Sequence, residues 1–90
     1  MGNKTNNKST PTEAAAMVIE TFAKTQTDGI KYCPRCGRMS VKERLHTNAL
    51  SRYIQVYICD SCGTDEAIRD SMGSPLPLQD WAIAKRRGKS

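Results

Sequence analysis

The four cysteines of the chain occur as two C-x-x-C-G steps, at residues 33–37 and 59–63. The two residues between paired cysteines allow both sulfurs to face a single ion, and the following glycine can adopt the positive φ that closes such a turn. Two steps brought face to face offer four thiolates in a tetrahedron, which is the closed ligand set of a structural zinc site. The sequence therefore predicts one structural Zn²⁺ ion bound by Cys33, Cys36, Cys59 and Cys62.

Three other uses of these cysteines stay open at this point. Four thiolates also suit an iron ion in a rubredoxin-like site. A redox-active dithiol would explain one C-x-x-C step and leave the other without a purpose. Two disulfides are the third alternative, but no hydrophobic signal peptide opens the sequence, so we do not expect an oxidising compartment. Because four cysteines already saturate zinc, we expect His46 to be a solvent-facing loop residue rather than a ligand.

The 22 residues between Cys36 and Cys59 suit a strand, a loop and a returning strand. Apolar and polar residues alternate over 39–45 and again over 54–58, which is the pattern of two half-buried strands. Residues 46–51 are expected to form the tip of this hairpin. The sequence thus predicts a zinc ribbon over residues 30–73, a small metal-stabilised α+β domain with two cysteine knuckles, a β-hairpin and a short following helix.

The segment before the ribbon divides into two parts. Residues 1–9 are polar and without periodicity, so we expect a disordered lead-in. Over residues 10–28, Thr10-Pro11-Thr12-Glu13 forms a capping box, and apolar residues then recur at helical spacing to about residue 25. This pattern predicts an amphipathic helix that packs on the ribbon, with dimerisation or partner binding as the alternative.

After the second C-x-x-C step, Thr64 is expected to cap a short helix that ends at Gly73. Residues 74–90 then comprise a proline-rich connector, a helix from about residue 78 to 87 and a basic tail. Trp81 is the largest apolar group of the chain, and we expect it in the core. An exposed interface anchor is the alternative for this tryptophan.

Length and composition limit the class of protein. Ninety residues, 38% of them hydrophobic, allow one small domain, to which a bound metal would add stability. No apolar run approaches the length of a membrane span, so we expect a soluble protein without a membrane partner. A closed four-thiolate site leaves no open metal position, and no acid–base pair accompanies it, so we expect no enzymatic activity.

The formal charge of +5 is unevenly distributed: residues 31–58 carry +5, residues 59–80 carry −4 and residues 81–90 carry +4. The basic stretches favour nucleic-acid binding, in which cations contact phosphates and tyrosines stack on bases. The same bipolar layout, with Leu50 in a loop and PLPLQDW at 75–81, also suits a protein partner. The candidate nucleic-acid contacts are Arg35, Arg38, Lys42, Arg44, Arg52, Tyr53, Tyr57, Lys85, Arg86 and Arg87.

Four stretches of the sequence resemble a family. CPRCG at 33–37 and YICDSCGTDEAIRD at 57–70, with LHTNALSR at 45–52 and PLPLQDWA at 75–82, are similar to small zinc-ribbon proteins encoded by phages and prophages of bacteria. The resemblance covers roughly residues 31–84. It implies zinc binding by the four cysteines and a location in the bacterial cytoplasm, but no activity. It also implies roles typical of phage proteins, such as a transcription accessory factor or an antagonist of a host defence complex.

Overall fold

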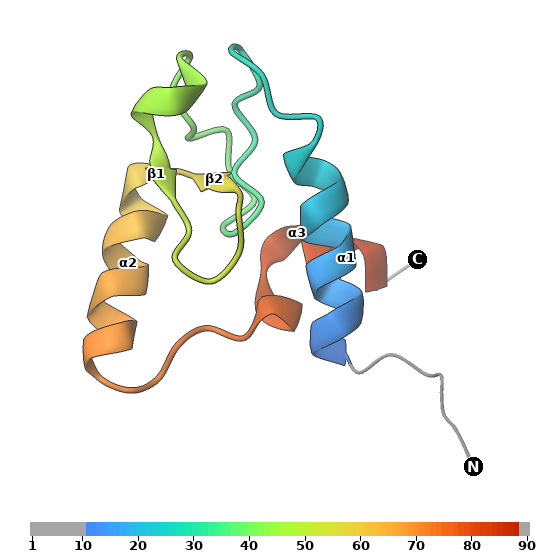
Figure 1. The fold of residues 1–90 in the computed structure, drawn as a ribbon, viewed down its shortest axis with the longest axis vertical. Helices are drawn as coiled ribbons and strands as arrows, with labels where there is room; N and C mark the ends of the chain where they lie inside the picture. The colour runs from blue at the N-terminus through green and yellow to red at the C-terminus, as the bar shows by residue number, and fades with distance from the viewer. Residues whose placement is uncertain (1–10, 89–90) are drawn as a thin grey trace.

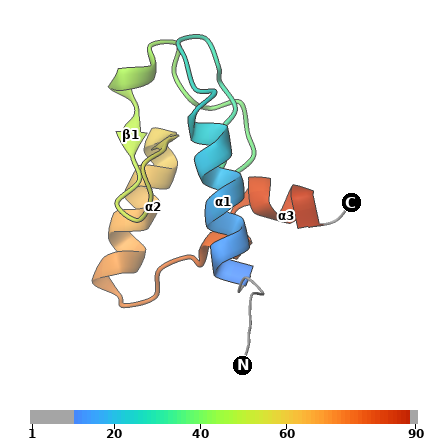
Figure 2. The same ribbon diagram turned by 45° about the vertical axis from the view of Figure 1, so that its right-hand side comes forward.

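The computed structural model of the chain describes residues 11–88 and shows a small α+β fold around a two-stranded hairpin (Figure 1). Figures 1 and 2 show α1 and α2 flanking the hairpin, with α3 beside α1. No helix within residues 11–88 is long and apolar enough to cross a membrane. The predicted lead-in and the Thr10 cap lie outside the described residues. In chain order the elements are α1 (Pro11–Ala23), η2 (Leu45–Thr47), β1 (Ala49–Leu50), β2 (Tyr57–Ile58), α2 (Asp60–Ser71), η3 (Leu78–Asp80) and α3 (Ala82–Gly88).

The predicted N-terminal helix is α1, which ends two residues earlier than expected. Its apolar face packs against η3 and α3, where Ala15 and Ile19 are buried. Thr12 Oγ1 adds a polar contact by donating a hydrogen bond to Gln79 Oε1 at 2.8 Å. Most of the stripe that suggested a partner helix is therefore used within the chain.

The strand predicted over residues 39–45 is wrong, because the structure assigns no strand to these residues. The buried Asn48 side chain explains the difference. Its Oδ1 accepts from the Lys42 N–H at 2.8 Å, and its Nδ2 donates to the carbonyl groups of Lys42, Arg44 and Leu45. The chain therefore folds around one amide, which occupies backbone groups that a strand ladder would otherwise pair.

The hairpin that does form is short. β1 and β2 are antiparallel, with Ala49 opposite Ile58 and Leu50 opposite Tyr57. The tip predicted at residues 46–51 is also wrong: η2 and β1 occupy most of that stretch, and residues 51–56 join the two strands.

Side chains protect the edges of this small sheet. The Gln26 side chain pairs with the outer backbone groups of Tyr57, accepting from its N–H at 3.0 Å and donating to its carbonyl at 2.9 Å. Just after β1, the Arg52 N–H donates to Glu66 Oε1 at 3.0 Å. These contacts replace the further strands that would normally pair with exposed edges.

The second C-x-x-C step lies on a helix, which corrects the prediction of a second knuckle. Cys59 is the N-cap of α2, so the helix begins at Asp60 rather than at Thr64. Gly63 does not adopt a positive φ. It is needed for space instead, because a Cβ atom on Gly63 would lie 2.6 Å from the Ala49 Cβ of β1.

Trp81 lies at the centre of the core, as predicted from the sequence. It is 0% exposed and packs with Ile19, Val56 and Ile58 in a cluster that includes three of the cysteines. The interpretation of Trp81 as an exposed anchor is wrong. The predicted C-terminal helix is interrupted at this residue, because Trp81 has an extended backbone (ψ 146°) that separates η3 from α3.

The first C-x-x-C step is a true knuckle. The Gly37 N–H donates to the Cys33 carbonyl at 2.8 Å, and the Cys33 N–H donates to the Arg38 carbonyl at 2.8 Å. Gly37 closes this turn with φ +83°, and α3 packs so closely that a Cβ atom on Gly37 would lie 2.9 Å from the Ala82 Cβ.

We therefore expect Gly37→Ala to destabilise the fold through both backbone strain and overpacking, by about 2–4 kcal/mol. Gly73→Ala is the matched control, because Gly73 also has a positive φ (+73°) but has nothing within 4 Å of an added Cβ. Gly73→Ala should lower the free energy of unfolding only by the backbone strain, about 1–2 kcal/mol. Urea denaturation of the metal-loaded proteins measures both values, and equal losses would show that the contact with Ala82 is unimportant.

Candidate metal centre

The four cysteines, which lie far apart in the sequence, form one cluster. All four Sγ atoms lie within 4.8 Å of one another. The distance is 3.8 Å between Cys33 and Cys62 and 3.9 Å between Cys36 and Cys59. A tetrahedral ion with metal–sulfur bonds of about 2.3 Å requires sulfur–sulfur separations of about 3.8 Å. The donor set therefore fits a single tetrahedral metal ion.

The same distances bear on the alternatives. Each cysteine is a free thiol, and the measured separations far exceed the roughly 2.0 Å of a disulfide bond. All four residues point to one centre, so no dithiol is left over for separate redox chemistry. Four thiolates bind iron in a similar geometry, so iron and zinc at this site differ in their chemistry and not in the sulfur–sulfur distances.

Two different local structures bring the ligands together. The knuckle supplies Cys33 and Cys36, whereas Cys59 is the N-cap of α2 and Cys62 lies in its first turn. The positive end of the α2 dipole favours thiolates at this position. The N–H of Cys59 also donates to Cys33 Sγ at 3.4 Å, so the backbone of one ligand pair stabilises a sulfur of the other.

The contact between Cys33 and Cys62 shifts the pKa values of both thiols. The hydrogen bond shared with Cys62 lowers the pKa of Cys33 to about 5, despite burial. The same bond raises the pKa of Cys62. The contact between the two sulfurs thus favours a thiolate at Cys33, and metal binding requires the remaining thiols to lose their protons.

The cluster is mostly closed to solvent. Cys33, Cys59 and Cys62 are buried, and the half-buried Cys36 has Ser40 Oγ at 3.6 Å from its sulfur. His46 is exposed in η2 and does not belong to the cluster. Within residues 11–88 this is the one group of three or more metal-ligating side chains that could hold an ion.

The basic residues predicted to contact nucleic acid fall into two groups. In the first group the cation is paired with a carboxylate of α2, which competes with a phosphate for that cation. Arg35 is only 6% exposed, so a phosphate contact by this residue is not compatible with the structure. The ion pairs are Arg35–Asp65 at 2.9 Å, Lys42–Asp60 at 2.9 Å and Arg52–Asp70 at 3.4 Å.

The second group is exposed and has no carboxylate partner among residues 11–88. Arg38 belongs here, although a hydrogen bond to Cys36 raises its pKa. The Arg86 guanidinium stacks over the Tyr32 ring at 5.3 Å. The side chain of Arg87 lies outside the described residues. The group comprises Arg38, Arg44, Lys85 and Arg86.

Neither predicted stacking tyrosine is fully free. The Tyr53 hydroxyl donates to Asp70 Oδ1 at 2.6 Å, and this bond raises the pKa of Tyr53. Tyr57 is half-buried in β2, and its backbone is held by Gln26.

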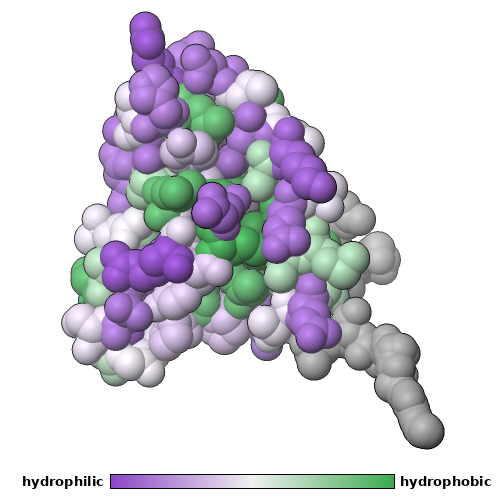
Figure 3. All heavy atoms as spheres, viewed as in Figure 1, coloured by the Kyte–Doolittle hydropathy of each residue, from purple (hydrophilic) through white to green (hydrophobic). Residues whose placement is uncertain are grey.

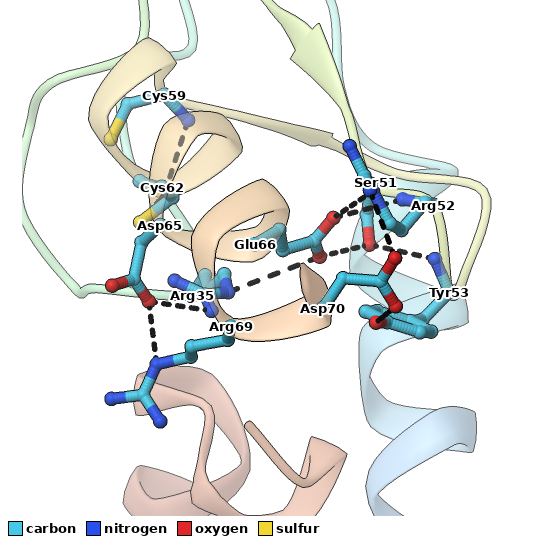
Figure 4. A network of polar contacts seen from close by, with 11 residues as sticks. Arg35, Ser51, Arg52, Tyr53, Cys59, Cys62, Asp65, Glu66, Arg69 and Asp70 are labelled. Carbon is cyan, nitrogen blue, oxygen red and sulfur yellow. Dashed lines mark hydrogen bonds and ion pairs between the residues drawn. The ribbon is translucent and has the colours of Figure 1, made fainter. Parts of the chain in front are cut away.

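Sequence reasoning missed the centre of this polar network, which is Glu66 (Figure 4). Its carboxylate is 3% exposed, accepts from Ser51 Oγ at 2.6 Å and forms ion pairs with Arg35 and Arg52. The signal was present as opposite net charges on residues 31–58 and 59–80. Three cations of residues 31–58 pair with acids of residues 59–80, and among these cations only Arg35 is buried.

Comparisons with models of protein families, with curated proteins and with solved structures found no match to this chain.

Proposed function

We propose that this protein is a non-enzymatic binding module whose fold depends on one structural zinc ion. The observation that carries the proposal is the cluster of four sulfurs, spaced for a tetrahedral ion and forming part of the hydrophobic core. Zinc prefers this closed thiolate set, in which it has no free position for a substrate or water. The domain is then a zinc finger with one knuckle, a short hairpin and a helix that supplies the second ligand pair.

Nucleic acid is the partner class that we propose. The support is the group Arg38, Arg44, Lys85 and Arg86, which are exposed and have no carboxylate partner among the residues that the structure describes, together with the net charge of +5. Contacts from such residues bind phosphates without strong sequence preference and weaken with salt. The resemblance to phage zinc-ribbon proteins adds to this proposal a bacterial cytoplasmic setting and an accessory or regulatory role.

The test compares two variants, one that lacks cations without carboxylate partners and one that lacks cations in ion pairs. Fluorescence anisotropy measures the affinity of each variant for single- and double-stranded DNA and RNA over a salt series. The triple variant R44Q/K85Q/R86Q removes three exposed cations that have no carboxylate partner among residues 11–88, and we expect it to bind at least tenfold more weakly at low salt. Its salt slope should fall by up to about 3, close to one for each lost phosphate contact.

The variant K42Q/R52Q/R69Q is the matched control, because it removes the same charge from residues that are paired with acids of α2. We expect it to keep most of the affinity. Equal losses in both variants would show that only net charge matters, and no binding by the wild-type protein would overturn the nucleic-acid proposal.

A protein partner is the second candidate, favoured by exposed apolar side chains near the hairpin and on α2. Leu50 is 52% exposed, Ile68 53% and Met72 66%. Figure 3 shows apolar residues gathered in the middle of one face, with polar residues around them. Such a module would bind and modulate a host complex of the transcription or defence machinery, with zinc purely structural. Self-association through α1 would rest on Met17, which is 63% exposed.

A further inference from the structure

Arg35 lies between the two cysteines of the knuckle, and its side chain is only 4% exposed. Its Nη2 donates to Asp65 Oδ2 at 2.9 Å, and its Nε lies 3.9 Å from Glu66 Oε2 without forming a hydrogen bond. Both acids follow Cys62 on α2 by about one helical turn. Arg35 therefore connects the segment that carries one ligand pair to the helix that carries the other.

The position of Arg35 also matters for charge. Four thiolates around a divalent ion leave a net charge of about −2, which is costly to bury without a counter-charge. Figure 4 shows the Arg35 side chain beside Cys62 and Asp65. A guanidinium is effectively always protonated in proteins. Arg35 is therefore a buried cation next to the sulfur cluster.

We propose that Arg35 is a positioning residue of the metal centre, which clamps the Cys62 turn of α2 to the knuckle and balances the charge of the loaded cluster. The inference rests on the proposed zinc site. Arg69 provides the internal comparison, because its Nε donates to the same Asp65 Oδ2 at 2.8 Å. Arg69 is 40% exposed and approaches that carboxylate from the solvent side, so it shares the acid but not the buried position.

The experiment measures how fast the metal leaves the full-length protein. One sample is loaded with cobalt(II), whose thiolate charge-transfer bands report a four-sulfur site. A second sample is loaded with zinc, and the transfer of zinc to a chromogenic chelator gives the release rate. Loss of an outer-shell partner typically weakens metal binding 10–100-fold, so we expect Arg35→Gln to release zinc faster by that factor. Arg69→Gln should stay within about twofold of wild type, and Arg35→Lys, which keeps the charge, should be intermediate.

A second variant separates this role from general destabilisation, because Arg35→Gln alone removes one of the two cations that pair with the buried Glu66 carboxylate. The double variant R35Q/E66Q removes both charges and keeps the shape of both side chains. We expect it to show a wild-type circular dichroism spectrum at saturating metal but to retain the fast release. Release at the wild-type rate would overturn the inference, since Arg35 would then only neutralise Glu66.

Two further outcomes distinguish this inference from the function on which it rests. Wild-type protein without cobalt–thiolate bands would overturn the zinc site and the role of Arg35 together. Wild-type bands combined with an Arg35→Gln variant that releases zinc no faster than Arg69→Gln would overturn the role of Arg35 alone.

Discussion

Cys33→Ser should leave the chain unfolded at room temperature, and this is the largest effect that we expect of a single substitution. Cys33 is 0% exposed and belongs both to the sulfur cluster and to the hydrophobic core. Zinc binding contributes on the order of 10 kcal/mol to the folding of small metal-dependent domains, which is as large as their whole stability. Serine supplies a poor ligand, so most of this contribution is lost. Far-UV circular dichroism and zinc content per chain measure the result.

Removing zinc from the wild-type protein with a chelator should have the same effect, and adding zinc back should restore the fold. Ser61→Ala is the control for the substitution, because Ser61 lies between the second pair of cysteines but is exposed to solvent. We expect this variant to bind one zinc and to melt like the wild type. A folded, metal-free Cys33→Ser protein would contradict a structural role for the metal.

Trp81→Ala should produce the second-largest loss of stability. Trp81 is 0% exposed and packs in the core cluster next to the segment that carries α3. Replacing a buried tryptophan by alanine removes its transfer free energy and leaves a cavity, which together cost about 3–5 kcal/mol. Urea denaturation of the zinc-loaded protein measures this as a lower midpoint.

Two further variants sharpen this test. Trp81→Phe should cost less than Trp81→Ala, because Nε1 of Trp81 has no hydrogen-bond partner within residues 11–88, so phenylalanine loses volume but no bond. Met72→Ala controls for the loss of a large apolar side chain at an exposed site, and its effect should lie within about 0.5 kcal/mol of zero. If Trp81→Ala were as mild as Met72→Ala, the C-terminal segment would not be part of the core.

Local patterns in the sequence were sufficient for several features. The repeated C-x-x-C-G spacing indicated the four ligands, because sulfurs two residues apart can face one ion whatever surrounds them. The helical period over residues 11–25 predicted α1, since an amphipathic stripe is a property of the segment itself. Trp81 was expected in the core because no other side chain offers as much apolar area.

The predictions that failed required knowledge of partners distant in the sequence. The alternation over residues 39–45 indicated a strand, but the Asn48 amide binds the backbone of that stretch. Gly63 suggested a second knuckle, yet the glycine is there because β1 passes close to α2. A C-x-x-C-G step fits both a knuckle and a helix start, and tertiary packing selects between them.

The charged residues show the same difference between local pattern and tertiary packing. The order of residues along the chain shows that a basic stretch precedes an acidic one, and from this we predicted a basic surface. Folding places Arg35, Lys42 and Arg52 against the acids of α2, which no local pattern indicates. Composition sets how many charges a segment carries, whereas the fold sets the distance between opposite charges and hence the strength of their interaction.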